Sequence, residues 1–523
     1  MTEHIPVIVR SDFPGGNGAN PVELAPDHWQ VEPQGDLIYG PWYYVEIQNT
    51  TGQDREIRLD VVGIPDAPGI VSQADRPVYR MGEGPWFPLG FNRAKLAATA
   101  RLRRYEEPIV WFWEREEPIP SDRWRDFPTV EAQLQIPVPA NTRVRVATTY
   151  PYLNRELHAL TNWLTQLPEQ QQRLVQVEMA GQSEEGRTIV TLVLTNPDIP
   201  VEQKQVVAIT ARHHPALEDS GSWCAEGIVE WLLSGHPRAN HVLDGWTFVV
   251  LPIVNPDSVE AGRTHYNVHG VDLFMDYLDR ISAEVQAVFN TLGQLRPDFL
   301  IDFHGWLLHQ MGQPPYDGSY LDIVNSLPWD SAVYKAMAEA WRERIYGFAS
   351  FALHRSIFRS CSAGRAYWEW HTLGVVTEVN PGDYSQFQIK LRAVDNLMGA
   401  IDLFEQRWPG YPIPGVPNRE IAVLGDVSLF AWGDNWEEVR SSRVALWRAR
   451  EGTRLEVSDK QVTVRAQELI GVPAAVRIPA PDVQTMITVN GKRVSSTVTT
   501  EDGWLFVPVT LDGEPVTVAI DTP

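Results

Sequence analysis

The sequence predicts an α/β protein in which a central α/β region is flanked by two regions made of β-strands. Short β-prone runs alternate with turn residues up to about residue 150, and beyond it apolar runs alternate with helical stretches. After residue 418, Asn-Gly and Asp-Gly dipeptides again separate β-prone runs. A length of 523 residues suits about three domains, and we place them at 1–150, 151–410 and 418–523.

The N-terminal region has the strand spacing and the alternation of apolar and polar residues that are typical of a β-sandwich. Its strand-like runs lie at 42–48, 56–62, 109–113 and 142–148. We therefore expect residues 1–150 to form a β-sandwich domain.

In the central region the apolar runs are short and largely uninterrupted, as expected of strands that are covered on both faces. They lie at 188–195, 206–210, 246–254, 299–303 and 374–379. Helices are expected at 156–167 and 386–406, and the prolines between 409 and 417 prevent the last helix from continuing. An α/β domain therefore occupies residues 151–410.

The C-terminal region carries the strongest short-range signal for β-hairpins, a two-residue turn between β-prone runs. Such turns occur at Asn490-Gly491, Asp502-Gly503 and Asp512-Gly513. Residues 418–523 are therefore predicted to form a small all-β domain.

Composition excludes several classes of partner and site. Lys and Arg number 44 against 67 Asp and Glu, so the formal charge of −23 argues against nucleic acid as a partner. An apolar run long enough for a membrane span is absent, and the N-terminus lacks the apolar segment of a signal peptide. We therefore expect a cytoplasmic protein without a membrane partner, whereas its oligomeric state stays unknown. With only two cysteines, a metal must be held by His, Asp or Glu.

Side chains of metal-binding type follow the predicted strands at the points where those strands end. Ligands of open α/β sheets bind at such strand ends. Each residue alone fits an ordinary polar position, but their joint occurrence favours one shared site. The residues are His213, His214, Glu218 and Asp219 after the strand at 206–210, His304 after the strand at 299–303, and Glu378 in the last strand.

Two histidines and one carboxylate leave a position open on tetrahedral Zn²⁺, and the metal lowers the pKa of a water bound there to about 7. His214, Glu218 and His304 fit this ligand set. A second carboxylate can act as general base toward the water, and Glu378 fits that role. The residues thus favour a zinc-dependent hydrolase.

Five motifs occur in the order seen in the zinc metallocarboxypeptidases, and the chain resembles most their cytosolic carboxypeptidase branch. Tyr150-Pro-Tyr152, at the end of the first β-region, resembles the junction that precedes the catalytic domain of that branch. The likeness covers about residues 20–405 and leaves out the C-terminal region. The motifs are Gly181-x-Ser183-x-x-Gly186-Arg187, His214-Pro with Glu218, Asn255-Pro-Asp257 with Gly270-Val-Asp272-Leu273, Asp302-Phe-His304-Gly, and Glu378.

The resemblance implies a mixed-sheet, zinc carboxypeptidase-like catalytic domain that hydrolyses a C-terminal amide bond and releases an amino acid. It implies that His214, Glu218 and His304 bind zinc and that Glu378 is the general base. Gly364-Arg365, ahead of the last strand, also matches the family, which places Arg365 among the substrate-binding residues.

One departure from the family pattern concerns the metal ligands. The family's zinc turn has its His and Glu three residues apart, whereas His214 and Glu218 are four apart. On a helical surface i+4 lies close to i+3, so a local bulge can absorb the extra residue. His213 or Asp219 is the alternative ligand.

Two further departures concern the substrate. Phe274 and Met275 stand where the family has the Asn-Arg pair that grips a terminal carboxylate, and neither side chain forms bidentate hydrogen bonds. His265, with Arg263 two residues away, stands where an arginine polarises the scissile carbonyl. Losing such a donor costs roughly 3 to 4 kcal/mol of transition-state stabilisation unless another group replaces it.

The leading hypothesis is zinc-dependent hydrolysis of a peptide or amide bond, with removal of a C-terminal residue. The altered substrate end leaves an N-acyl amino acid, an amidated end or a cell-wall peptide as alternative substrates of an amidohydrolase. The alternative from another class of function is a carboxypeptidase-like binding protein that has lost catalysis. The charge of −23 disfavours acidic, glutamate-rich tails as substrates.

Overall fold

A computed structural model of the chain describes most of residues 7–305 and shorter segments beyond them. The predicted run at 109–113 lies outside the described residues. The described ranges are 7–33, 42–65, 77–89, 103–105, 125–127, 129–216, 218–305, 319–325, 350–355, 361–370, 372–379, 385–406, 422–424, 427–431, 454–458, 461–465, 473–479, 486–494, 498–499, 504–510 and 514–521.

The central region is built on an eight-stranded mixed sheet. Its inner strands β15, β14, β16 and β19 run parallel, whereas β12 and β13 on one side and β17 on the other pair antiparallel with their inner neighbours. In spatial order the strands are β12 (Val175–Gln182), β13 (Thr188–Leu194), β15 (Trp246–Leu251), β14 (Gln205–Ala211), β16 (Phe299–His304), β19 (Leu373–Val379), β17 (Ser319–Asn325) and β18 (Ser350–Arg355). The predicted mixed α/β architecture is confirmed.

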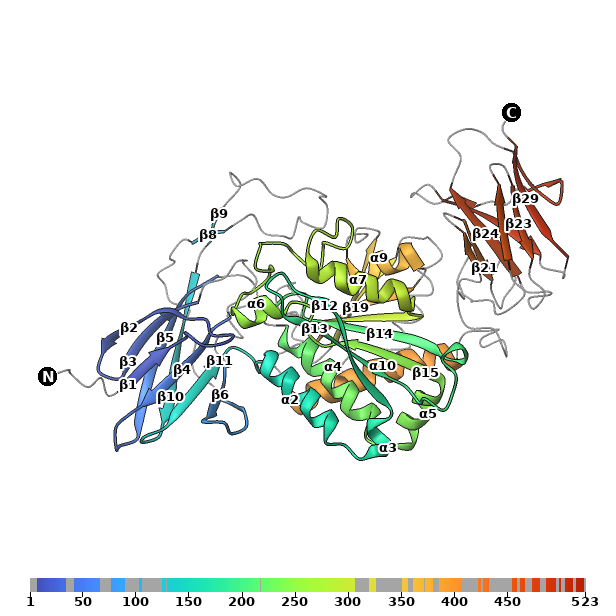
Figure 1. The fold of residues 1–523 in the computed structure, drawn as a ribbon. Helices are drawn as coiled ribbons and strands as arrows, with labels where there is room; N and C mark the ends of the chain where they lie inside the picture. Colours follow the sequence, from blue (N-terminus) through green and yellow to red (C-terminus); the bar gives the residue numbers. More distant parts are fainter. Residues whose placement is uncertain are drawn as a thin grey trace.

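Helices cover both faces of this sheet (Figure 1). Apolar residues of α2 (Asn154–Thr165), α4 (Asp219–Leu232) and α10 (Gln386–Gln406) share one buried cluster with Val207 and Ile209 of β14. The neighbouring strand residues Val206 and Ala208 pack into a second cluster with α7 (Ala283–Leu295) and α9 (Ser362–Trp370). Alternate strand residues therefore serve opposite faces, which explains why these strands read as uninterrupted apolar runs. The remaining short helices are α3 (Glu169–Gln172), α5 (Pro237–Gly245) and α6 (Pro256–Glu260).

The N-terminal region consists of strands that form a five-stranded and a four-stranded sheet. Alternating apolar residues of both sheets belong to one buried cluster, for example Val45 and Ile47 of the first sheet and Leu134 and Ile136 of the second. The first sheet has the order β1 (Val7–Arg10), β4 (Tyr44–Asn49), β11 (Arg143–Ala147), β6 (Val78–Met81) and β7 (Phe87–Pro88). The second has the order β10 (Thr129–Val138), β5 (Arg55–Pro65), β3 (His28–Glu32) and β2 (Ala19–Ala25), and β8 (Arg103–Tyr105) pairs with β9 (Arg125–Phe127).

A loop of the N-terminal region docks on the segment that follows α6. Gly15 donates its N–H to the carbonyl of Glu260 at 2.8 Å, and the Asn17 side chain donates to the carbonyl of Gly262 at 3.1 Å. Gly262 has a φ of 64°, and a Cβ there would lie 2.5 Å from the carbonyl oxygen of Gly16. Only glycine suits this close approach of two backbones.

The described strands beyond residue 420 form two five-stranded sheets. Asn490 and Gly491, with φ of 49° and 76°, form the tight turn of the β25–β26 hairpin, as predicted. Asp512 and Gly513 lie outside the described residues, and the strands that flank them, β28 and β29, belong to different sheets. The first sheet has the order β20 (Ala422–Leu424), β21 (Val427–Ala431), β24 (Pro473–Pro479), β28 (Trp504–Thr510) and β27 (Val498–Thr499). The second has the order β22 (Arg454–Ser458), β23 (Gln461–Arg465), β29 (Val516–Asp521), β25 (Met486–Val489) and β26 (Lys492–Arg493).

Candidate metal centre

Three adjacent parallel strands bring the predicted site residues to one edge of the central sheet. Ala211 at the end of β14 lies opposite Phe303 of β16, and His304 lies opposite Glu378 of β19. His213 and His214 follow β14 directly, so the chain turns at this edge before α4 begins. Parallel register thus places residues that are far apart in the sequence side by side.

His214, Glu218 and His304 form one buried cluster at this edge, with 2 to 6% of each residue exposed. His214 Nδ1 lies 2.7 Å from Glu218 Oε1, and His304 Nδ1 lies 2.9 Å from Glu218 Oε2. Each of the three residues offers a ligand atom, and these atoms all lie within 4.8 Å of one another. The four-residue spacing therefore still brings Glu218, the last residue before α4, onto both imidazoles.

Glu218 raises the pKa of both histidines, and the histidines in turn lower the pKa of Glu218. Burial alone would lower the pKa of His214, but the charges of Glu218 and Asp272 and its hydrogen bonds to them raise it from 6.5 to about 10. The pKa of His304 is raised well above its usual value against the effect of burial, because Glu218 and Asp302 attract its charged form. Burial would raise the pKa of Glu218, yet its two histidine neighbours lower it.

The cluster fits a divalent metal. The contact between Glu218 Oε2 and His304 lacks hydrogen-bond geometry, so this buried oxygen has no hydrogen-bond partner in the part of the chain that the structure describes. A buried acceptor left in that state is costly. Two imidazole nitrogens and a carboxylate oxygen form the donor set that zinc takes in catalytic sites. A zinc ion between the three side chains would satisfy the unpaired oxygen.

Asp272 lies behind His214 as a second layer. His214 Nε2 lies 3.2 Å from Asp272 Oδ1, and His265 Nε2 lies 3.0 Å from Asp272 Oδ2. Burial alone would raise the pKa of Asp272, but His265 and His214 lower it well below its usual value. Contact with an ionised carboxylate fixes the orientation of the His214 ring and leaves its Nδ1 for a ligand.

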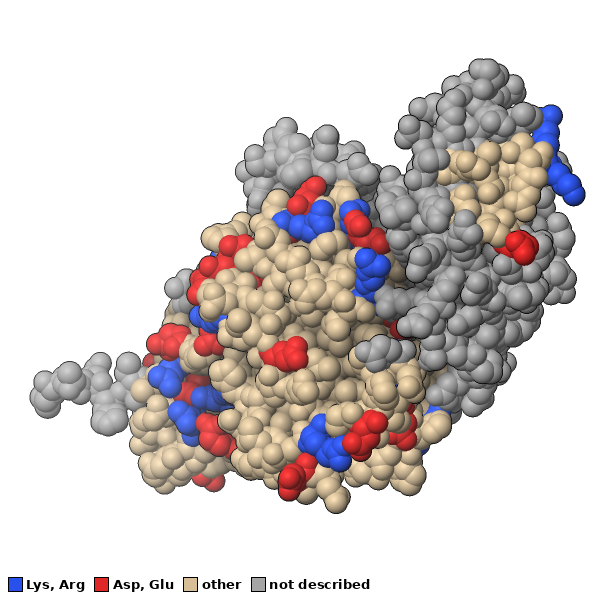
Figure 2. Space-filling view, turned by 45° about the vertical axis from the view of Figure 1, so that its right-hand side comes forward, with Lys and Arg blue, Asp and Glu red and all other residues tan. Residues whose placement is uncertain are grey.

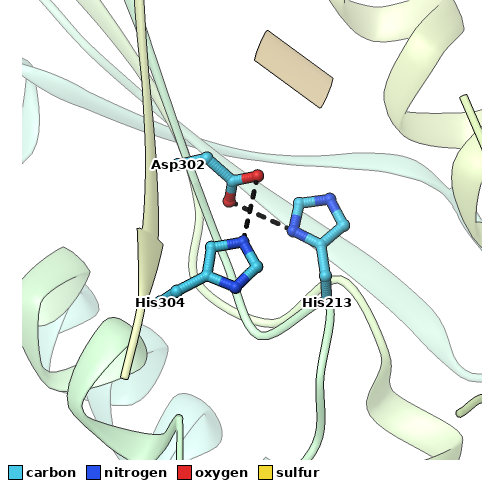
Figure 3. Close-up of side chains that lie close together, drawn as sticks. All are labelled: His213, Asp302 and His304. Carbon is cyan, nitrogen blue, oxygen red and sulfur yellow. Dashed lines mark ion pairs between the residues drawn. The ribbon is translucent and has the colours of Figure 1, made fainter. Parts of the chain in front are cut away.

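Asp302 occupies the equivalent place behind His304. Figure 3 shows its carboxylate facing both His304 and His213, with contacts of 3.3 Å to His304 Nε2 and 3.1 Å to His213 Nδ1. The attraction of these two histidines lowers the pKa of Asp302 well below its usual value, although burial acts in the opposite direction. Both candidate histidine ligands therefore have a carboxylate on the nitrogen that faces away from Glu218.

The two alternative ligands point elsewhere. Asp219 accepts hydrogen bonds from the guanidinium of Arg212 at 2.6 Å and from the backbone N–H of Tyr152 at 2.7 Å. His213 contacts Asp302 on one side and the Tyr277 hydroxyl, at 2.7 Å, on the other. The geometry thus favours the pair His214 and Glu218.

The predicted substrate residues divide into two groups. His265 and Phe274 lie in the site: the His265 ring stacks on His214 with centroids 3.9 Å apart, and the Phe274 ring lies edge-on to His304 at 4.7 Å. Met275 packs against the apolar cluster that contains Phe274, on the face of the sheet that α7 covers. Next to the histidines, the site is therefore lined by the aromatic ring of Phe274.

The remaining predicted residues are not brought to the histidines by any described contact. Arg263 donates to the carbonyl of Asn267 at 3.2 Å, and Arg365 pairs with Glu369 within α9. The backbone of Glu378 lies beside that of His304, but its side chain lies outside the described residues.

Sequence reasoning assigned no role to Asp272, Asp302 or Tyr277. A signal for Asp302 exists, because an ionisable residue in the apolar run Phe299–Phe303 must have a buried partner. Asp272 and Tyr277 give no such signal, since only the folded chain brings the loop after residue 265 onto His213 and His214.

Sequence comparison finds zinc carboxypeptidases among the proteins that this chain resembles. Residues 160–288 match the sequence model of the zinc carboxypeptidase family. Human cytosolic carboxypeptidase 2 is 25% identical over 315 residues, which cover 57% of this chain and 33% of that protein. Mouse cytosolic carboxypeptidase 6 is 36% identical over 104 residues, or 20% of this chain and 19% of that protein. The chain spans a third or less of the length of these curated relatives.

Solved structures show the same fold. A metallo-carboxypeptidase from Burkholderia cenocepacia superposes with a TM-score of 0.56 at 19% identity, covering 76% of this chain and 98% of that one. A metallo-carboxypeptidase from Pseudomonas aeruginosa gives a TM-score of 0.53 at 18% identity, with coverage of 76% and 98%. The fold is therefore carboxypeptidase-like. Among the described residues, no helix is long and apolar enough to cross a membrane.

Proposed function

Since residues 160–288 match the sequence model of the zinc carboxypeptidase family, we propose that the protein is a zinc-dependent hydrolase of carboxypeptidase type. Its reaction is the cleavage of a peptide or amide bond at the C-terminal end of a substrate. The observation that carries this proposal is the buried cluster of His214, Glu218 and His304 at the edge of the central sheet.

The three residues of this cluster would hold the zinc ion. When bound, zinc supplies a Lewis acid and lowers the pKa of a coordinated water toward neutrality. The protein orients both imidazoles through Asp272 and Asp302, which contact their far nitrogens. Three protein ligands held in this way would leave the metal accessible to water and substrate.

Glu378 is the proposed general base. Its backbone lies beside that of His304 on the adjacent parallel strand, which supports a place at the same edge. A carboxylate there takes a proton from the attacking water and returns it to the leaving amine. Hydrolysis therefore needs His304 at the end of β16 and Glu378 near the end of β19.

The substrate end differs from that of a simple carboxypeptidase. The Phe274 ring contacts His304 and His214, with centroids 4.7 and 5.8 Å apart, and offers no hydrogen bond to a carboxylate. This supports an uncharged or acylated group there, as in an N-acyl amino acid or an amidated peptide, with Arg365, Arg263 and Met275 as further substrate contacts. Figure 2 shows acidic and basic side chains interspersed on one face, while the net charge of −23 disfavours polyanionic partners.

The proposed arrangement around the catalytic domain of residues 151–410 is a β-sandwich at 1–150 and an all-β domain at 418–523. The two sheets of the N-terminal region share one apolar cluster, which supports the sandwich. The cytosolic relatives support a cytoplasmic location.

Metal analysis of the full chain, purified without added zinc, tests the proposal. We expect one zinc per chain in the wild type and in Glu378→Gln, and none in His304→Ala. His241→Ala, at an exposed histidine, is the matched control and keeps its zinc. Peptides with free, amidated and acylated ends then test hydrolysis, which Glu378→Gln abolishes. Equal metal content in wild type and His304→Ala would show that the site is wrong.

A second candidate function is binding without turnover. It is favoured by His265, whose Nε2 contacts Asp272 where a substrate-polarising donor was expected. Zinc at full occupancy, no cleavage of any of the three peptide classes, and binding unchanged by Glu378→Gln would support this function instead.

A further inference from the structure

We propose that Asp302, held in place by His213 and Tyr277, is a positioning residue that keeps His304 ready to bind the metal. This inference rests on the proposed zinc site and extends it by a buried chain of polar groups: Tyr277, His213, Asp302 and His304. All four residues have at most 2% of their surface exposed. Polar groups buried this deeply are costly unless each one has a partner.

Asp302 contacts four polar side chains. Its Oδ1 accepts a hydrogen bond from the Thr210 hydroxyl at 2.9 Å and lies 3.1 Å from His213 Nδ1. Its Oδ2 accepts a hydrogen bond from the Ser362 hydroxyl and lies 3.3 Å from His304 Nε2. The two hydroxyls donate hydrogen bonds, and the two histidines face the carboxylate as ion-pair neighbours. The carboxylate is thereby held from β14, β16 and α9 at once.

This arrangement decides which nitrogen of His304 meets the metal. A neutral imidazole has one N–H and one lone pair, and the partner of the N–H sets the tautomer. The Asp302 carboxylate lies 3.3 Å from Nε2, and its charge favours a proton on that nitrogen, which leaves the lone pair on Nδ1 once the ring is neutral; Nδ1 is the atom that lies 2.9 Å from Glu218. Without an acceptor at Asp302, the ring can rotate and the proton can move to the nitrogen that zinc requires.

His213 and Tyr277 stabilise the carboxylate from the opposite side. The rings of His213 and His304 are parallel within 3°, with centroids 5.8 Å apart, and both face the Asp302 carboxylate (Figure 3). The far nitrogen of His213 lies 2.7 Å from the Tyr277 hydroxyl. Tyr277 itself packs in the apolar cluster under α7 and α9. The polar chain therefore ends in a rigid aromatic anchor.

The same three groups, His213, Asp302 and His304, are also spaced like metal ligands, with atoms within 4.8 Å of one another. The hydrogen bonds from Thr210 and Ser362, which already hold the carboxylate in place, favour the positioning role, and the number of ions bound per chain distinguishes the two.

The test is a zinc titration of the full chain against a competing chelator, combined with the visible spectrum of the cobalt-substituted protein. Asp302→Asn is expected to weaken zinc binding about 10- to 100-fold, which is the usual effect of removing such a partner, and to alter the cobalt spectrum. Tyr277→Phe is expected to weaken binding to a smaller extent, and it tests the inference should Asp302→Asn not fold. One zinc per chain is expected.

The matched control is Asp276→Asn. Asp276 is also a buried carboxylate, but it accepts its hydrogen bonds from Ile281 and Ser282 at the start of α7. Its zinc affinity should equal that of the wild type even if its melting temperature falls. Wild-type affinity and spectrum in both Asp302→Asn and Tyr277→Phe would overturn the positioning role alone. Two zinc ions per chain would overturn it in favour of a second site, and a wild type that binds no zinc would overturn the proposed function as well.

Discussion

A buried ion pair beside the metal cluster offers a prediction about stability that also tests the ligand assignment. Arg212 and Asp219 are each 1% exposed in their side chains, and the guanidinium lies 2.6 Å from the carboxylate. Asp219 also accepts the N–H of Tyr152, which belongs to the segment that joins the N-terminal region to α2. The pair thus links this junction to the first residue of α4, directly after Glu218.

Asp219→Asn removes one charge and leaves Arg212 buried and unpaired. Breaking a buried pair in this way costs about 3 to 5 kcal/mol, which corresponds to a fall of roughly 6 to 20 °C in the melting temperature of a domain of this size. Burial raises the pKa of Asp219 despite the attraction of Arg212, so the pair itself brings little net stability. Removing both charges together should therefore cost much less than the sum of the single changes.

Thermal unfolding of Arg212→Met, Asp219→Asn and the double variant measures this coupling, which should reach about 2 kcal/mol or more. Zinc content is measured on the same samples, and we expect all three variants to retain their metal. Strictly additive losses would refute the reasoning on the ion pair. Loss of zinc from a stable Asp219→Asn would instead make Asp219 the ligand in place of Glu218.

Three further predictions concern the site and the docking of the N-terminal region. Zinc binding should tighten as pH rises from about 6.5 toward 10, because His214, whose pKa is raised to about 10, must lose its proton to bind the metal. Calorimetry in buffers of different ionisation enthalpy measures the released protons. A zinc affinity that does not depend on pH would contradict this prediction. Phe274→Asn should raise kcat/KM for peptides with a free carboxylate relative to amidated ones by about 10-fold or more, and an unchanged ratio would mean that Phe274 does not select the substrate end. Gly262→Ala should cost about 1 to 3 kcal/mol by clashing with Gly16; Gly235→Ala, at a similar φ of 73° with open space around it, is the control in thermal unfolding and should cost less.

The pH prediction also has a consequence for the stability of the metal-free chain. His214 has a higher pKa in the folded chain than in the unfolded one, so its contribution is fully present below about pH 6.5 and is lost as pH rises toward 10. Zinc replaces the proton, so the zinc-bound chain should lose less stability over this range.

The central sheet and the first layer of the site could be predicted from sequence, because both depend on local patterns. Apolar runs bounded by turns located β13, β14, β16 and β19, and the end of α10 follows from the prolines after it. Strand ends then indicated His214, Glu218 and His304. The pairing of strands is less local: Asp512-Gly513 has the residues of a hairpin turn, yet the strands on either side join different sheets.

The second layer could not be predicted, because it depends on contacts between distant segments. The different surroundings of His213 and His214 come from Tyr277 and Asp272, which approach from a loop some sixty residues later in the chain. The sequence contains the two histidines as neighbours with equal chemistry. Only the folded arrangement directs one to Glu218 and the other to Asp302.

Charge balance connects these layers. The described cluster holds the buried carboxylates Glu218 and Asp302 and the partly buried Asp272, and histidines contact all three. Without metal, the charge is offset by protons on histidine, and the raised pKa values of His214 and His304 express this. A zinc ion would supply two positive charges at the same place, which would allow those histidines to become neutral ligands. The second-layer carboxylates therefore favour either a bound metal or bound protons, and the exchange between the two makes zinc affinity depend on pH.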